Sequence, residues 1–268
     1  MKNKRLTIFL IIFAFFAVIV VLTSTVFALN FAEVKFLSTT NVLTGTEEEI
    51  LSSANFRFGE SVFFSSKSTY IKNIEKSNPY ARVVNIETIF PNKFVINIAE
   101  RNECYAIKLS AGKNKNKYAI TDEYLKVLNI VANFQNTTAN AIPLENSGLE
   151  NQDVDVGDFF QTNNDYFKVL FNSLREWKIS YLDVKAKVLS IQTDYEKADR
   201  LLINMRSGVQ IIIENSSRQM SDKINLAYSI FETTTDKNGN EVDYTKSGII
   251  LVTETDSKIY ALYKPLED

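Results

Sequence analysis

The 268-residue chain contains no histidine and a single cysteine, Cys104. Without histidine it cannot form a histidine-containing catalytic triad, a histidine-ligated zinc site or an imidazole general base. One cysteine excludes an intramolecular disulfide, so packing alone must stabilise the fold. Cys104 precedes an apolar run, which is typical of an inert core thiol rather than of a nucleophile.

Glycine is also scarce, with eight residues in the chain. So few glycines leave little material for phosphate-binding loops, and no Gly-x-Ser-x-Gly elbow or Cys-x-x-Cys pair is present. The 30 basic and 32 acidic residues give a formal net charge of -2. There is no basic excess to neutralise nucleic-acid phosphates. We therefore predict no cofactor and no nucleic-acid partner.

Three aspartates, Asp153, Asp155 and Asp158, lie close together and could suggest a divalent cation site. Their spacing places Asp158 where a calcium-binding loop requires glycine, and the terminal glutamate of such a loop is missing. We interpret the three carboxylates as solvated, because Val154 and Val156 alternate with them as in a strand. Two carboxylates far apart in sequence could still serve glycoside hydrolysis, but no motif indicates them. We predict no metal site and no catalytic residue.

The N-terminus carries a long apolar run, and no residue from Leu6 to Leu29 is charged. As a helix with about 1.5 Å rise per residue, the run is roughly 35 Å long, enough to cross a hydrocarbon core of about 30 Å. Lys2, Lys4 and Arg5 precede it, and such positive charge stays in the cytoplasm. We predict a cytoplasmic N-terminus (residues 1–5), one transmembrane helix in the lipid bilayer (residues 6–29) and an extracytoplasmic remainder.

The same segment has a second interpretation as a cleaved signal peptide. Val26-Phe27-Ala28 provides small or β-branched residues at the positions that a signal peptidase reads. Cleavage after Ala28 would release a secreted binding module. The apolar run is longer than the roughly 7 to 15 residues of a usual signal core, which favours a retained anchor.

Residues 30–100 have the pattern of a compact α+β module. A strand-like run, Val34 to Leu37, precedes two helices. The first helix starts at a capping box, with Thr46 three residues before Glu49, and the second spans about Lys67 to Lys76. Two alternating apolar runs then predict a hairpin around Pro91-Asn92, with Val84, Ile86 and Phe90 on its first strand and Phe94, Ile96 and Ile98 on its second.

Residues 101–268 predict a larger, mainly antiparallel β-rich domain with two or so helices. One helix is capped near Asn164 or Asp165, and another spans about Ser221 to Phe231. The first carries an apolar stripe typical of a core: Phe167, Leu170, Phe171, Leu174 and Trp177. The predicted strands are Tyr105 to Leu109, Tyr118 to Thr121, Lys126 to Val131, Tyr181 to Thr193, Leu201 to Met205, Val209 to Ile213, Ile249 to Thr253 and Ile259 to Tyr263.

Several short motifs follow one another in a fixed order behind the N-terminal anchor. They are Gly59 with Val62-Phe63, Asn78-Pro79-Tyr80, Phe90-Pro91, Glu100-Arg101, Tyr118 to Asp122, Leu125 to Leu128, Ser207-Gly208-Val209 to Ile213, and Lys223. In these motifs and in the order of its elements the chain resembles the FtsQ/DivIB family of bacterial cell-division proteins. The segment from Val34 to Ala99 is similar to the family's POTRA domain. Two departures are the extra polar residues from Ser38 to Thr44 and Glu214-Asn215 in place of a common glycine.

This resemblance implies an α+β fold and a non-enzymatic divisome scaffold at the division septum. Its partners would be FtsB/DivIC-like and FtsL-like proteins and septal peptidoglycan synthases. The family's last strands recruit the DivIC-type partner, and a final strand often lies at a sheet edge, where another strand can pair with it. The binding residues would be Ile259, Tyr260, Ala261, Leu262 and Tyr263.

The sequence alone leaves open two alternatives to this hypothesis. The final strand could be paired on both sides within its own domain, which would leave no edge for a partner. The whole chain could also be a membrane-anchored hydrolase of the cell wall, which would need a cleft with converging carboxylates.

Overall fold

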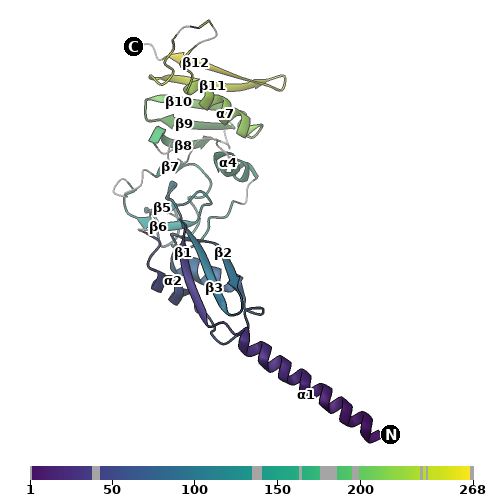
Figure 1. Cartoon of the computed structure of the whole chain (residues 1–268). Helices are drawn as coiled ribbons and strands as arrows, with labels where there is room; N and C mark the ends of the chain where they lie inside the picture. Colours follow the sequence, from purple (N-terminus) through teal and green to yellow (C-terminus); the bar gives the residue numbers. More distant parts are fainter. Residues whose placement is uncertain are drawn as a thin grey trace. The chain divides into compact units, whose positions relative to one another are not determined.

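The protein is described here from a computed structural model (Figure 1). The chain divides into two compact units, Met1–Arg101 and Asn102–Asp268, and each has a hydrophobic core of its own. The structure describes residues 2–37, 43–134, 141–162, 165–175, 186–194, 199–235, 238–239 and 241–265.

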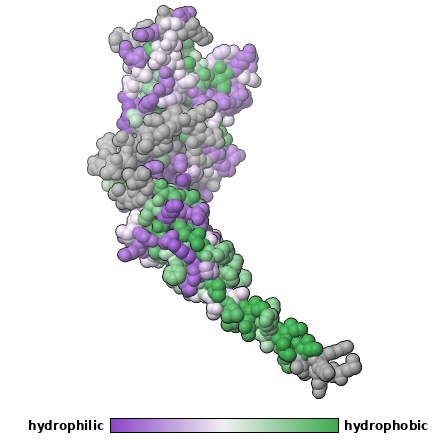
Figure 2. Space-filling model, viewed as in Figure 1, coloured by the Kyte–Doolittle hydropathy of each residue, from purple (hydrophilic) through white to green (hydrophobic). Residues whose placement is uncertain are grey.

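The first unit begins with α1 (Lys2–Val26), an apolar helix whose described side chains, at residues 8–26, are all exposed. In the described part of the chain, α1 is the one helix long and apolar enough to cross a membrane, over the 19 residues Ile8–Val26. Figure 2 shows most of its described surface as hydrophobic. Apolar side chains without protein contacts are more stable in lipid than in water, so α1 fits a single-pass membrane anchor.

The rest of the first unit is a three-stranded sheet with two helices. β3 lies in the centre of the sheet, parallel to β1 and antiparallel to β2. Helix α2 contacts β1, α3 contacts β2, and the two helices pack against each other. This order of elements confirms the predicted α+β module. The elements are β1 (Phe31–Phe36), α2 (Glu47–Ala54), α3 (Lys67–Ser77), β2 (Ala81–Ile89) and β3 (Lys93–Glu100).

The predicted capping box starts α2. The Glu49 N–H donates to the Thr46 hydroxyl at 3.3 Å, and the Thr46 N–H donates to the Glu49 carboxylate at 2.8 Å. The cap gives partners to two N–H groups that the helix itself cannot satisfy. Ile50 and Ala54, one and two turns further on, are fully buried in the core of the unit.

Replacing Thr46 by alanine should lower the free energy of unfolding of the first unit by about 1 kcal/mol, because a capping hydrogen bond is lost. Urea denaturation of the full chain in detergent measures this change. The matched control is Thr46→Ser, which keeps the hydroxyl and should retain most of the stability. Equal losses in the two variants would show that the hydroxyl does not act as a cap.

The hairpin of the first unit departs from the predicted alternation in its first strand. A β-bulge between Val83 and Asn85 shifts the register of β2 against β3. Val83 and Ile86 therefore point into the core, whereas Val84 is 51% exposed. Val84, Ile86 and Phe90 do not share one buried face, because an inserted residue reverses the side-chain direction in a strand. The prediction for β3 is confirmed, since Phe94, Ile96 and Ile98 are fully buried.

A buried ion pair holds the end of the first unit together. The Arg101 guanidinium donates to the Glu75 carboxylate at 2.9 Å and to the Ala81 carbonyl at 3.3 Å. The other Glu75 oxygen accepts the Val83 N–H at 2.9 Å. Arg101 follows directly on β3, so the pair connects α3, β2 and β3. This contact gives a structural role to the arginine of the Glu100-Arg101 motif.

The second unit is built on one nine-stranded sheet, in the order β12-β11-β10-β9-β8-β7-β4-β5-β6. Neighbouring strands are antiparallel except for the parallel pairs β10–β11, β7–β8 and β4–β7. The α+β fold with an antiparallel-rich second part is therefore confirmed. The strands are β4 (Tyr105–Lys108), β5 (Tyr118–Thr121), β6 (Val127–Val131), β7 (Ile142–Glu145), β8 (Val188–Asp194), β9 (Arg200–Met205), β10 (Val209–Glu214), β11 (Gly248–Thr255) and β12 (Lys258–Pro265).

Two helices of the second unit pack on this sheet. Helix α7 (Met220–Phe231) contacts β10, β11 and β12, and α4 (Asp165–Arg175) packs against α7. The Tyr166 and Ser216 hydroxyls are hydrogen-bonded at 2.9 Å, which ties the start of α4 to the segment before α7. In the predicted stripe of α4, Leu170, Phe171 and Leu174 are buried and Phe167 packs against the same core.

Several sequence predictions for the second unit need correction. Strand β7 was not predicted, because its four residues include a proline and are too few for a clear alternation. Val154 and Val156 do not form a strand: Val154 is buried, and Val156 lies in an exposed turn. The strand predicted over residues 181–193 is observed as β8, which begins at Val188. Outside the described residues lie Asn164, Trp177 and residues 181–185.

Candidate functional site

The last strand, β12, is an end strand of the sheet in the second unit (Figure 1). It pairs antiparallel with β11 along its whole length, from Lys258 opposite Thr255 to Pro265 opposite Gly248. Within the described ranges, no strand pairs with its other edge. Backbone N–H and C=O groups on such an edge can pair with an added strand.

The five predicted binding residues all lie on β12, and their side chains point alternately to the two faces of the sheet. Tyr260 and Leu262 are 51% and 56% exposed. Ile259, Ala261 and Tyr263 are partly buried and pack against the hydrophobic core. The structure therefore separates the predicted set into two residues that face outward and three that pack against the core and hold the strand in place.

The outward face of β12 continues an apolar row that crosses four strands. Leu262 lies opposite Leu251 of β11, Leu251 opposite Ile212 of β10, and Ile212 opposite Leu202 of β9. Directly opposed residues have their side chains on one face of a sheet. Leu262 ends the row and is its most exposed member, whereas the other three are half-buried. A strand added beside β12 could extend this row with an apolar side chain of its own.

The opposite end of the same sheet is partly covered by the protein itself. Strand β6 is the end strand there, and residues 157–160 lie along it. The Val127 N–H donates to the Asp158 carbonyl at 2.8 Å, and the Gly157 N–H donates to the Val127 carbonyl at 2.8 Å. These two hydrogen bonds use backbone groups that an added strand would need. Of the two sheet ends, β12 is therefore the better site for strand addition.

The C-terminal half of β12 is held by the loop that precedes β11. The Tyr263 ring packs on the Tyr244 ring, with 4.6 Å between centroids, and its hydroxyl donates to the Ser247 carbonyl at 3.3 Å. The ring also lies over Gly248, where an added Cβ would be only 2.6 Å from it. Nearby, the Thr245 hydroxyl and N–H donate to Asp243 and lower the pKa of its carboxyl. Tyr263 is thus a supporting residue of the edge rather than a free contact.

A buried lysine supports the β11–β12 hairpin from α7. Lys223 is fully buried, and its ammonium group donates to the Glu254 carboxylate at 3.1 Å. It also donates to the carbonyls of Glu214 at 3.2 Å and Asn215 at 2.8 Å, at the end of β10. Glu254 lies directly opposite Ile259 of β12. Lys223 therefore joins α7 to the ends of β10 and β11 beside the candidate edge.

The other groups that the sequence singled out are engaged in structural contacts. The Asp155 carboxylate pairs with the Lys113 ammonium at 2.6 Å, and this contact raises the pKa of Lys113. Asp158 accepts the Asp155 N–H at 2.8 Å. Cys104 is buried, and its thiol donates to the Asn102 carbonyl at 3.3 Å. In the described part of the chain, no group of three or more Cys, Asp or Glu residues could hold a metal ion.

Comparison with known families identifies the membrane-proximal part of the chain. Residues 32–101 match the family model described as POTRA domain, FtsQ-type. This segment is an FtsQ-type POTRA domain. The domain comprises β1, α2, α3, β2 and β3, and the match ends at Arg101, whose buried ion pair closes it. A search of curated proteins found no match.

The POTRA domain is consistent with the FtsQ/DivIB family that the sequence motifs resemble. Domains of this type are typically non-enzymatic, and the match supports a general role as a scaffold in cell division. Together with α1, the POTRA domain fits a protein anchored by a single pass through the membrane.

Sequence reasoning missed two features of the candidate edge. The first is the apolar row, because the alternation in β9, β10 and β11 shows which residues share a face but not which strands are neighbours. The second is the role of Glu254 as the buried partner of Lys223. The one feature of the sequence that could have indicated this role is the position of Glu254 at the end of an apolar strand. Many strands end in a charged residue, so this position alone does not identify a partner for Lys223.

Proposed function

We propose that this protein is a non-enzymatic divisome scaffold of the FtsQ/DivIB type. In this proposal residues 1–5 lie in the cytoplasm, and residues 30–100 and 101–268 are two extracytoplasmic domains. Residues 6–29 are the membrane segment, which crosses the bilayer through α1 and reaches the outer surface at Leu29, a core residue of the POTRA domain. The FtsQ-type POTRA domain and the apolar helix α1 support it. The orientation rests on the basic residues at positions 2, 4 and 5 and on the retention of positive charge inside.

The binding site of the scaffold is the free edge of β12, and its occupant is an extended segment of an FtsB/DivIC-like protein that is itself paired with an FtsL-like protein. Main-chain hydrogen bonds to β12 supply affinity, and side chains placed beside Tyr260 and Leu262 supply specificity. The observation that carries this proposal is the position of β12 at the end of the sheet with one paired edge.

Membrane anchoring makes weak contacts sufficient for assembly. Partners confined to the same membrane meet at a high effective concentration, so a short strand pairing can hold them together without a large interface. By collecting the DivIC-like and FtsL-like proteins at the septum, the scaffold helps to regulate the septal peptidoglycan synthases.

A photocrosslinking amino acid at position 262 tests the binding site in the source cell. We expect a covalent adduct with the DivIC-like protein, because a strand added to β12 lies within contact distance of this side chain. The matched control is position 156, where Val156 is 44% exposed in the same unit but precedes the segment that runs along β6, at the opposite end of the sheet from β12. Equal adducts at the two positions, or none with a DivIC-like protein at position 262, would refute the assignment.

A fluorescent fusion and a peptidoglycan zymogram test the scaffold role against that of an anchored hydrolase. A scaffold concentrates at mid-cell and leaves no clearing band in the gel. Fluorescence spread uniformly over the membrane, together with a clearing band, would contradict the proposal.

A further inference from the structure

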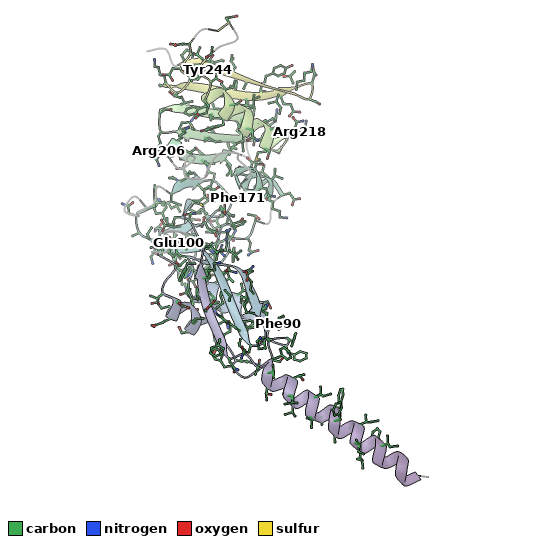
Figure 3. The ribbon with its side chains drawn as sticks, in the orientation of Figure 1. Phe90, Glu100, Phe171, Arg206, Arg218 and Tyr244 are labelled. Carbon is green, nitrogen blue, oxygen red and sulfur yellow. The ribbon has the colours of Figure 1, made fainter. Side chains whose placement is uncertain are left out.

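An exposed group of phenylalanines lies at the end of the POTRA domain that adjoins α1. We call Phe58, Phe63, Phe64 and Phe90 the phenylalanine patch. They are 60%, 59%, 90% and 60% exposed. They come from two loops, residues 55–66 and 90–92. Figure 3 shows Phe90 at the end of the domain from which α1 leaves. Several large apolar side chains exposed together on a folded domain indicate an interaction surface.

Backbone hydrogen bonds hold the first of these loops next to the end of α1. The helix ends at Val26, and the Val62 N–H donates to the Phe27 carbonyl at 2.9 Å. The Leu29 N–H donates to the Glu60 carbonyl at 2.8 Å, and the Gly59 N–H donates to the Leu29 carbonyl at 2.9 Å. The loop is therefore attached within three residues of the helix end.

The second loop is attached in the same way, and side chains join the two. The Asn30 N–H donates to the Asn92 carbonyl at 2.9 Å. The Phe27 ring, the first after the helix, lies 5.1 Å from Phe63 and 6.3 Å from Phe90, and Phe63 lies 5.5 Å from Phe90. The Phe27, Phe63 and Phe90 rings thus form one aromatic group directly after α1, whose last turn carries Thr23, Ser24 and Thr25 with their hydroxyls bonded to helix carbonyls.

The length of α1 sets the level of the patch relative to a bilayer. The 19 residues Ile8–Val26 span roughly 28 Å at about 1.5 Å per residue, close to the hydrocarbon thickness of about 30 Å. Phe27 then lies at the outer boundary of the hydrocarbon, and the loops bonded to residues 27–30 lie in the headgroup layer. At this level phenylalanine, like tryptophan and leucine, can enter the boundary between headgroups and acyl chains by about 5 to 10 Å.

We propose that the phenylalanine patch inserts into the outer interfacial layer of the bilayer that α1 spans. The POTRA domain then lies on the membrane surface instead of moving on a free tether. Arg57 and Glu60, which form an exposed ion pair at 3.2 Å in the same loop, meet the lipid headgroups. This inference rests on the proposed single membrane span of α1 and adds a second membrane contact to it.

Tryptophan fluorescence of the full chain in nanodiscs tests the contact. The sequence has one tryptophan, so Trp177→Phe gives a background in which Phe64→Trp is the single probe. Lipids brominated on the upper acyl chain quench tryptophan that reaches them. We expect quenching of F64W at least about twofold stronger than that of a probe held in water, because an interfacial side chain reaches the acyl boundary.

Two matched probes make the result decisive. Phe16→Trp lies within α1 and should be quenched if the helix spans the bilayer. Leu37→Trp follows the far end of β1, where Leu37 is also exposed, at 49%. It lies roughly 20 Å from the start of the strand at about 3.3 Å per residue. It should not be quenched. Quenching of F16W and F64W but not of L37W supports the proposal.

Two other outcomes overturn it, and they differ in what they exclude. If F16W is quenched but F64W is no more quenched than L37W, the membrane span stands and lipid contact of the patch is refuted. The patch would then face another protein. Absence of quenching in F16W would refute the membrane span itself. If the tryptophan-free background fails to fold, spin labels at Phe64→Cys and Leu37→Cys repeat the comparison in a chain that retains Trp177. The native Cys104 is buried and should not take up the label.

Discussion

Replacing Tyr260 and Leu262 together by proline should reduce co-purification of the DivIC-like partner to background. Proline has no N–H, and its ring prevents close approach of a neighbouring backbone. An N–H that points outward would no longer be there to pair with an added strand, and one that points toward β11 would no longer hold β12 in the sheet. Both losses remove the edge at which the proposed partner would bind. The measurement is co-purification of the two full-length proteins from detergent-solubilised membranes.

A second variant separates loss of the edge from loss of the fold. The double variant Tyr260→Thr with Leu262→Thr keeps every backbone N–H and removes both large outward side chains. Threonine is itself a good strand former, so β12 should persist. We expect binding to weaken about tenfold or more, since truncation of a central apolar contact costs over about 1 kcal/mol. In both variants the POTRA domain should keep its unfolding transition. Undiminished binding in the proline variant would refute β12 as the site.

Replacing Lys223 by methionine should lower the free energy of unfolding of the second unit by about 3 to 5 kcal/mol. Methionine has a similar length but leaves the Glu254 carboxylate, which is 13% exposed, without its buried cation. It also leaves the carbonyls of Glu214 and Asn215 without this donor. Such a loss corresponds to a melting temperature lower by roughly 6 to 20 °C for a unit of this size. Thermal unfolding of the full chain in detergent measures it.

The matched control is Lys187→Met in the same unit. Lys187 pairs with Glu232 at 2.6 Å, but the two side chains are 38% and 42% exposed, so water replaces the lost contact. We expect a cost below about 1 kcal/mol. The double variant Lys223→Met with Glu254→Leu should regain much of the stability, because an apolar pair removes the buried charge. Equal effects of Lys223→Met and Lys187→Met would contradict the structural role of Lys223.

Local sequence patterns predicted the α+β module of the first unit well. The Thr46 capping box, the helix from Lys67 and the alternation of Phe94, Ile96 and Ile98 all depend on residues within a few positions of one another. The exception is β2, where a bulge after Val83 reverses the expected faces. A bulge depends on the partner strand, which the sequence of β2 alone does not contain.

In the second unit, single strands were predicted better than their arrangement. Strands β5 and β10 lie where alternation and the Ser207-Gly208 turn place them, but β7 was missed and Val154 and Val156 were wrongly taken as strand residues. Alternation cannot reveal the parallel pairing of β10 with β11 either, because α7 and a long loop separate them in the sequence. Pairing across such a distance depends on which faces α7 covers.

By itself, the sequence determined the long apolar helix at the N-terminus, the absence of histidine and disulfide chemistry, and most of the order of helices and strands. These are properties of composition and of short-range periodicity, which each segment carries alone. Only the tertiary structure decided that β12 ends the sheet, that Leu262 completes an apolar row, and that Lys223 reaches Glu254. It also brought the phenylalanines of two loops to the end of α1. Each of these features joins residues from segments far apart in the chain, and only the packing of the whole unit sets which segments become neighbours.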